Sequence, residues 1–118
     1  MGFSGINNFP THSIVDGTFR DILEETGMGF SKEVEMVRLS AEMDLYSCVY
    51  VATAEEAIQM AEVGADTIIA HVGTTIGGSI GVVGATVDMD FAIKRTKEII
   101  KAGQKVNSDI IFLSLIHI

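Results

Sequence analysis

Residue types that could carry out chemistry gather in the first quarter of the chain. The apolar run 13–15 ends at Asp16, and Arg20 and Glu24 follow on a predicted short helix, residues 18–26. In parallel α/β proteins, the polar residues that follow a strand's carboxyl end lie where these folds bind ligands. The stretch therefore predicts a ligand-binding edge, at which Asp16 would move a proton or hold a metal ion.

Each of these residues also has a plain structural interpretation. Asp16 has the form of a helix N-cap, a role compatible with chemistry. Arg20 would either clamp a carboxylate or phosphate with two parallel hydrogen bonds or pair with Glu24 one helical turn away. Glu24 and Glu25 are consecutive, so on a helix they point about 100° apart and cannot both face one site. Pairing with Arg20 makes Glu24 the better candidate.

A second group of chemical residues surrounds His71, at the end of the predicted strand 66–73. A neutral imidazole at this place can act as an acid or a base, although a histidine beside a strand is ordinarily a satisfied core residue. The loop after it offers hydroxyls and unhindered amides, as a cradle for phosphate or carboxylate or as a plain flexible loop. It lacks the lysine of a P-loop. The candidate binding residues in this loop are Thr74, Thr75, Gly77, Gly78 and Ser79.

Strands and helices must alternate to position these residues. Helices are expected at 18–26, 32–43, from a Thr53 capping box to Gly64, and at 88–106, and strands at 13–15, 46–51, 66–73 and from 109 to 112. On the last helix, Met89, Ile93, Thr96 and Ile100 form the predicted apolar stripe. Strands this apolar indicate a parallel sheet buried on both faces. An open doubly wound sheet and part of a (β/α)8 barrel both fit, although no Gly-x-Gly-x-x-Gly follows the first strand to support a dinucleotide fold.

Composition narrows the classes of partner. The 118 residues are 47% hydrophobic and carry a net charge of −8, which argues against nucleic acid or an anionic membrane as a partner. The basic positions 94, 95, 97 and 101 are interpreted as a solvated helix face. The single cysteine, Cys48, excludes an intramolecular disulfide and is interpreted as a small buried residue rather than a nucleophile. With no apolar run near the roughly 20 residues that span a bilayer, we expect a cytoplasmic protein.

Ordered blocks along the chain carry a family resemblance. From Gly5 to about Phe112, the chain resembles the phosphoenolpyruvate hydrolase-like family of TIM-barrel proteins. The matching blocks are Gly5-Ile6-Asn7-Asn8-Phe9-Pro10-Thr11, Asp16-Gly17-Thr18-Phe19-Arg20, Leu23-Glu24-Glu25-Thr26-Gly27-Met28-Gly29, Glu33-Val34-Glu35-Met36, Tyr50-Val51, Glu56-Ala57, Gly64-Ala65-Asp66, His71-Val72-Gly73-Thr74-Thr75 and Gly77-Gly78-Ser79-Ile80-Gly81.

The resemblance implies an α/β fold with parallel strands, a partial (β/α)8 barrel that corresponds to strands four to seven. A complete barrel needs roughly 250 residues. Residues 1–112 would form the partial barrel domain. After Phe112 the family continues into a Cys-His-Gly-Gly-Pro loop, whereas this chain reads Leu-Ser-Leu-Ile-His-Ile. Residues 113–118 are therefore expected to be a non-native junction tail.

The resemblance also implies a function. It points to an enzyme that acts on a small phosphorylated or carboxylated acid by lyase or hydrolase chemistry. Asp16 and His71, with Glu24, would handle protons, and Arg20 and the loop 74–79 would bind the anionic group. A divalent metal such as Mg²⁺ enters by analogy only, and no metal ligand set is assigned. The alternative is a non-catalytic signalling or protein-interaction domain. Half a barrel is expected to be inactive by itself, and it would aggregate, pair with a copy of itself or need the missing half.

Overall fold

The computed structural model describes residues 2–14, 17–71 and 89–115. Its elements are β1 (Gly5–Asn7), the 3₁₀ turn η1 (His12–Ile14), α1 (Gly17–Glu25), α2 (Phe30–Glu42), β2 (Tyr46–Val51), α3 (Ala54–Glu62), β3 (Thr67–His71), α4 (Met89–Val106) and β4 (Ile111–Leu115). None of the helices in these ranges is long and apolar enough to cross a membrane.

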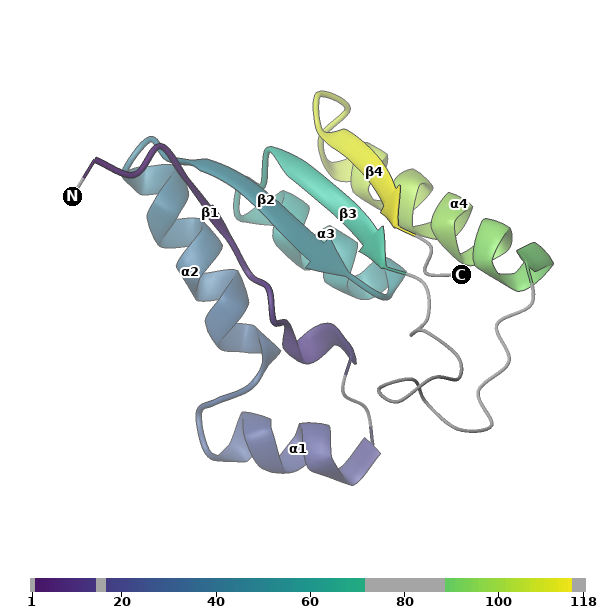
Figure 1. Ribbon diagram of the computed structural model, residues 1–118, viewed down its shortest axis with the longest axis horizontal. Helices are drawn as coiled ribbons and strands as arrows, with labels where there is room; N and C mark the ends of the chain where they lie inside the picture. Colours follow the sequence, from purple (N-terminus) through teal and green to yellow (C-terminus); the bar gives the residue numbers. More distant parts are fainter. Residues whose placement is uncertain (1, 15–16, 72–88, 116–118) are drawn as a thin grey trace, which may run out of the picture.

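The four strands form one parallel sheet in the order β1-β2-β3-β4 (Figure 1). Each strand pairs with the strand before it in the chain; in the register, Cys48 lies opposite Asn7 on one side and Thr67 on the other. A doubly wound sheet reverses its strand order at a switch point, whereas a (β/α)8 barrel keeps the order of the sequence. The prediction of an α/β fold arranged as part of a barrel is confirmed. Which four of the eight strands these are stays a prediction.

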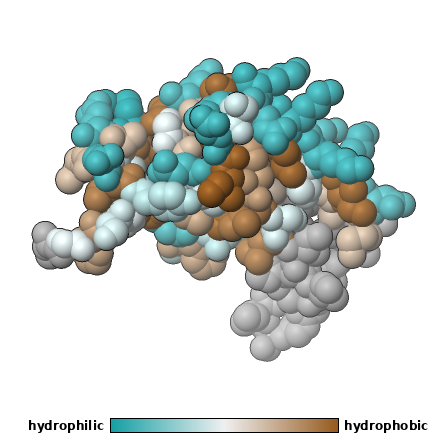
Figure 2. Space-filling view, turned by 90° about the horizontal axis from the view of Figure 1, so that it is seen from above, coloured by the Kyte–Doolittle hydropathy of each residue, from teal (hydrophilic) through white to brown (hydrophobic). Residues whose placement is uncertain are grey.

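Helices α2, α3 and α4 lie on the same side of the sheet (Figure 1). Alternate residues of the strands point toward them: Val49 and Val51 of β2 and Ile68 of β3 are fully buried, together with Met60 of α3 and Ile99 of α4. Seen from above, hydrophilic side chains cover the outer side of the helices, and hydrophobic residues are frequent toward the sheet (Figure 2). The other side of the sheet carries no helix among the described residues, and we call it the open face.

Local sequence signals define α3 at both ends. The Thr53 hydroxyl accepts a hydrogen bond from the Glu56 amide (3.2 Å), and the Glu56 carboxylate accepts from the amides of Thr53 (3.3 Å) and Ala52 (2.7 Å). This is the predicted capping box, which satisfies amides that a helix start leaves without partners. Gly64 follows the helix with a φ of +97°, a conformation that glycine adopts without a steric cost.

The first predicted strand is wrong. The segment predicted as strand 13–15 is helical over its described part, and the first strand is instead β1. The Thr11 hydroxyl accepts a hydrogen bond from the Ser13 amide (3.1 Å), which folds the chain locally into a turn. In addition, the His12 amide donates to the Glu33 carboxylate of α2 (3.0 Å) rather than to a neighbouring strand.

The predicted apolar stripe of α4 is also wrong. Met89 and Ile93 are about half exposed, and the buried residues of the helix are Ala92, Ile99 and Gly103. Small residues allow α4 to approach the sheet closely: a Cβ atom at position 103 would lie 2.6 Å from the ring of Phe112 in β4. Close backbone approach, rather than side-chain size, therefore decides which face of α4 is buried.

The domain boundary expected at residue 112 stays a prediction. In the structure, β4 continues through Leu115 and pairs with β3 along its whole length, so that Leu113 lies opposite Ile69 and Leu115 opposite His71.

Candidate functional site

The carboxyl ends of β1, β2 and β3 meet at one edge of the sheet, and aromatic side chains gather there on the open face. Tyr50 is the next-to-last residue of β2, and His71 is the last residue of β3. Their ring centroids are 6.2 Å apart in an edge-to-face arrangement, and the ring of Phe9, two residues after β1, lies 5.4 Å from Tyr50. His71 is 9% exposed, so its imidazole is held within this group.

Asn8 fixes how β1 and β2 separate at this edge. Its side-chain amide donates to the Tyr50 carbonyl (3.1 Å), and its carbonyl oxygen accepts from the Tyr50 amide (2.7 Å). The buried side chain thus makes both hydrogen bonds that a neighbouring strand would make with Tyr50. The chain is freed to turn away after Asn7, and Phe9 is placed against the Tyr50 ring.

Arg20 reaches the same edge from α1. Its Nη2 lies 2.8 Å from Oε1 of Glu56, whose side chain is 3% exposed. The other carboxylate oxygen of Glu56 accepts from the Ala52 amide, directly after β2. The Arg20 guanidinium also lies over the Phe30 ring, 5.6 Å from its centroid. A buried carboxylate needs such a partner, and in turn it fixes the position of the cation.

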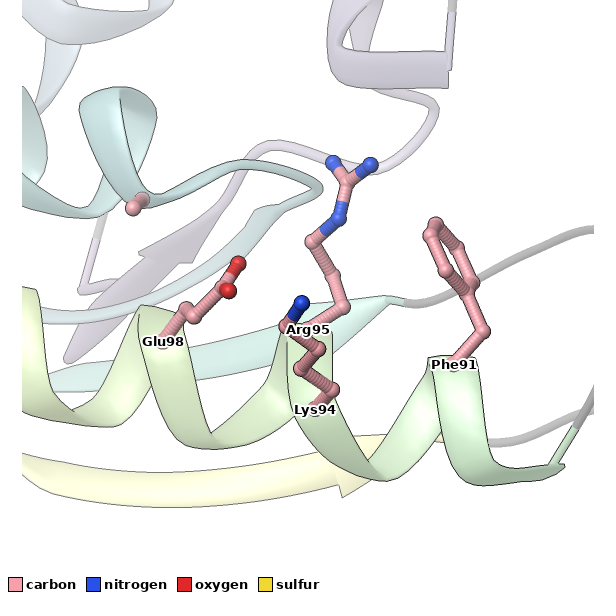
Figure 3. Close-up of a pocket in the computed structure, with 5 residues that line it drawn as sticks. Phe91, Lys94, Arg95 and Glu98 are labelled. Atoms are coloured by element: carbon pink, nitrogen blue, oxygen red, sulfur yellow. The ribbon is translucent and has the colours of Figure 1, made fainter.

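Arg95 approaches this connection from α4. Its Nη1 donates to the Ala52 carbonyl (3.2 Å), and its guanidinium lies 5.1 Å from the centroid of the Phe91 ring. Figure 3 shows Arg95 and Phe91 extending from α4 along a pocket of about 200 Å³. This pocket is lined by Ala54, Phe91, Lys94, Arg95 and Glu98.

For Arg95, the interpretation as part of a solvated helix face is wrong. Its side chain is partly buried and bonded to the backbone after β2. A usable signal is present in the sequence: Ala92, Arg95 and Ile99 are spaced i, i+3, i+7 and so share one helix face. The structure therefore contains two arginines at the end of β2, where the sequence indicates only Arg20.

Glu24 lies in a different environment from Arg20. Its carboxylate accepts hydrogen bonds from the Ser31 hydroxyl (2.7 Å) and the Ser31 amide (3.0 Å), at the start of α2. These bonds lower the pKa of the Glu24 carboxyl, with a smaller contribution from the charge of Arg20. The one-turn spacing suggested an ion pair of Arg20 with Glu24, but the ion pair that Arg20 makes is with Glu56. A catalytic role of Glu24 stays a prediction.

Several candidates lie outside the described residues: Asp16, Thr74, Thr75, Gly77, Gly78 and Ser79. In the segment before Asp16, the described residues 12–14 form the turn η1 rather than the predicted strand. In the described ranges, no three His, Cys, Asp or Glu side chains are grouped to hold a metal ion. Burial raises the pKa of the Cys48 thiol, which agrees with its interpretation as a structural residue.

The residues at this sheet edge belong to a stretch of sequence that matches a known protein family. The model of the family described as phosphoenolpyruvate hydrolase-like matches residues 1–117. The chain belongs to the phosphoenolpyruvate hydrolase-like family. Of the residues at the sheet edge, Asn8, Arg20, Tyr50, Glu56 and His71 all fall within the blocks that carry the resemblance.

Curated relatives of this family member include two tomato (Solanum lycopersicum) proteins. They are the ToMV susceptible protein tm-1(GCR26), 44% identical over 113 residues, and the ToMV resistance protein Tm-1(GCR237), 43% identical over 113 residues. The matched region is 96% of this chain and 15% of each tomato protein. A putative transcriptional regulatory protein, y4pA, of Sinorhizobium fredii is 41% identical over 80 residues, which are 68% of this chain and 13% of that protein.

Proposed function

We propose that this member of the phosphoenolpyruvate hydrolase-like family acts on a small phosphorylated or carboxylated acid by hydrolase or lyase chemistry. The observation that carries the proposal is that two arginines lie at the residue that follows β2 and a histidine ends β3, both at the carboxyl edge of the parallel sheet. Ligands of barrel enzymes bind at this edge.

The negative net charge of the chain makes the position of its arginines important for binding an anion. With a net charge of −8, the protein as a whole repels anions, so that an anionic substrate needs a local group of cations. Arg20 and Arg95 bring two positive charges to the surroundings of Ala52, against the one negative charge of Glu56. Glu56 and the Ala52 carbonyl already hold the two guanidiniums in place. Binding of a substrate would therefore cost little side-chain entropy at these two arginines.

His71 has the role of proton donor or acceptor. It lies at the strand end, within the aromatic group of the open face. An imidazole titrates near neutral pH and can accept a proton from an attacking water or donate one to a leaving oxygen. Asp16 and the loop 74–79, outside the described residues, remain further candidates for the same site.

Replacing Arg20 by alanine tests the proposal. The chain and a full-length family member are assayed against phosphonopyruvate and related acids, with and without Mg²⁺. Arg20→Ala is expected to raise KM or lower kcat at least about tenfold, because a charge-assisted contact is lost. Arg38→Ala is the matched control, since Arg38 forms exposed ion pairs with Glu35 and Glu42 within α2. Equal kinetics of the wild type and the Arg20 variant would remove Arg20 from the site.

The second candidate is a non-catalytic interaction or signalling domain. The names of the relatives denote a susceptibility protein, a resistance protein and a putative regulator rather than enzymes. The open face also presents apolar side chains, among them Ile111, which is 55% exposed, and Leu113, which is 49% exposed. Binding of the acids without turnover in either the chain or the full-length relative would favour this candidate.

A further inference from the structure

We propose that Tyr50 contacts the substrate of this site, donating a hydrogen bond from its hydroxyl to an anionic oxygen, and that Asn8 is its positioning residue. This inference rests on the proposed function, because it assigns a further group to the same anion-binding edge. Neither residue belongs to the set of candidates that the sequence indicates by chemistry.

The strand register places Tyr50 on the face where a ligand would enter. Val49 and Val51, its neighbours along β2, are buried against the helices, so Tyr50 points to the open face. Tyr50 lies opposite Ile69 of β3, which makes His71 its diagonal neighbour on the same face. The 6.2 Å between the two rings agrees with this placement. A group that reaches His71 from the open face therefore passes the Tyr50 ring.

A comparison of the two tyrosines of the chain shows what is special about Tyr50. Tyr46, at the amino end of the same strand and on the same face, uses its hydroxyl in a hydrogen bond to the Thr67 hydroxyl. No residue within 2–14, 17–71 and 89–115 makes a hydrogen bond to the Tyr50 hydroxyl. The Tyr50 hydroxyl can therefore donate to a ligand oxygen at the carboxyl edge without breaking a hydrogen bond to the described residues.

The backbone of Tyr50 is fixed more firmly than a residue at a strand end requires. Asn8 bonds both its amide and its carbonyl, and the Asn8 amide group also lies 3.3 Å from the Thr11 hydroxyl. The ring is held between Phe9 and His71. This support limits the motion of the hydroxyl, as expected for a group that must meet a ligand in one geometry.

The test is the binding of phosphonopyruvate, measured by isothermal titration calorimetry on the wild-type chain and three variants. Tyr50→Phe removes only the hydroxyl and is expected to weaken binding about tenfold or more, because hydrogen bonds to charged groups contribute strongly. Tyr46→Phe, the matched control, is expected to stay within about twofold of the wild type. Asn8→Ala is expected to weaken binding as Tyr50→Phe does, and Asn8→Ala combined with Tyr50→Phe should add little further loss.

The comparison of the variants separates contact from mere packing. Tyr50→Phe keeps the ring that packs against Phe9 and His71 and removes only the hydroxyl, so a loss of binding in this variant reports the contact. Circular dichroism and urea midpoints show whether each variant is folded. Unchanged binding in Tyr50→Phe, with binding lost in Arg20→Ala, would overturn this inference and leave the proposed function standing. Equal losses in Tyr50→Phe and Tyr46→Phe would also overturn it. No binding by the wild type would overturn both.

Discussion

At the scale of single residues, the Ala52 peptide connects the candidate site. Its amide donates to Glu56, which pairs with Arg20, and its carbonyl accepts from Arg95. Two cations from helices far apart in the sequence are thus joined through one backbone unit and one buried carboxylate. Removing Glu56 would take away this ion pair of Arg20, and removing Arg95 would leave the Ala52 carbonyl without that donor.

The hydrogen bonds of Glu24 predict that the stability of the folded chain depends on pH. Its pKa is lowered in the folded chain by the Ser31 hydroxyl and amide, so its contribution to stability is full above the unfolded-state pKa, about 4.3. That contribution is lost as the pH falls through the lower folded-state pKa. We expect Glu24→Gln to be slightly less stable than the wild type in urea at pH 7 and equal to it near pH 2.

The comparison residue for that measurement is Glu25, which is exposed and adjacent on α1. Glu25→Gln changes the net charge equally, so it should show no comparable dependence on pH. If both variants behave alike, the effect comes from overall charge and not from the bonds to Ser31.

The candidate site was predictable where charge stands out in the sequence. Arg20 and His71 could be named as candidates because each lies near an apolar segment and a glycine- or threonine-containing turn, although the described part of the segment before Arg20 is helical and not a strand. Arg95 shares a helix face with Ala92 and Ile99, but charged residues at 94, 97 and 101 surround it, so this spacing is hard to tell from a solvated face in the sequence. The pairing of Asn8 with Tyr50 joins positions 42 residues apart, and nothing local indicates it.

At the scale of elements, close approach of backbones organises the helix layer. Gly103 of α4 lies against the Phe112 ring of β4, and Ala92 lies on the same face of α4. The sequence predicts the helices and β2 well because their periodicity and caps are local. It fails for β1, because three residues with little apolar character become a strand only through pairing with β2.

Gly103→Ala tests this packing. The new methyl group would lie 2.6 Å from the Phe112 ring, so the ring or the helix must move. Overpacking costs about 1–3 kcal/mol, which exceeds the gain of about 0.5–1 kcal/mol from replacing a helical glycine. We expect a net loss of unfolding free energy of about 1 kcal/mol in urea denaturation.

Replacing Phe112 by a smaller residue provides the control for the Gly103→Ala variant. In the double variant Gly103→Ala with Phe112→Leu, the overlap is removed, so alanine at position 103 should cost less than in the wild-type background. A Gly103→Ala variant more stable than the wild type would show that Phe112 moves aside freely.

At the scale of the whole molecule, the sheet is covered on one side only among the described residues. Phe112 points to α4, so its strand neighbours Ile111 and Leu113 point to the open face, where both are about half exposed. The strands β1 and β4 also end the sheet without a further strand in the part that the structure describes. Such edges and faces favour association.

Leu113→Lys is therefore expected to lower self-association of the chain and its binding of a hydrophobic dye, measured by light scattering and dye fluorescence. Ser114→Lys places the same charge one residue along β4, on the side away from the open face. It should change both signals much less. Equal effects of the two variants would show that net charge, and not the apolar face, controls association.

The order of the strands has a consequence for how the chain acquires its structure. Each strand after β1 pairs with the strand made just before it. The paired residues are nevertheless far apart in sequence, as are Gly5 and Tyr46 or Thr67 and Ile111, and such non-local parallel pairing is slow. Successive units can dock one at a time while the ribosome is still extending the polypeptide. A stalled or shortened product would then already hold the β1–β2 pair and the Asn8 contacts with Tyr50.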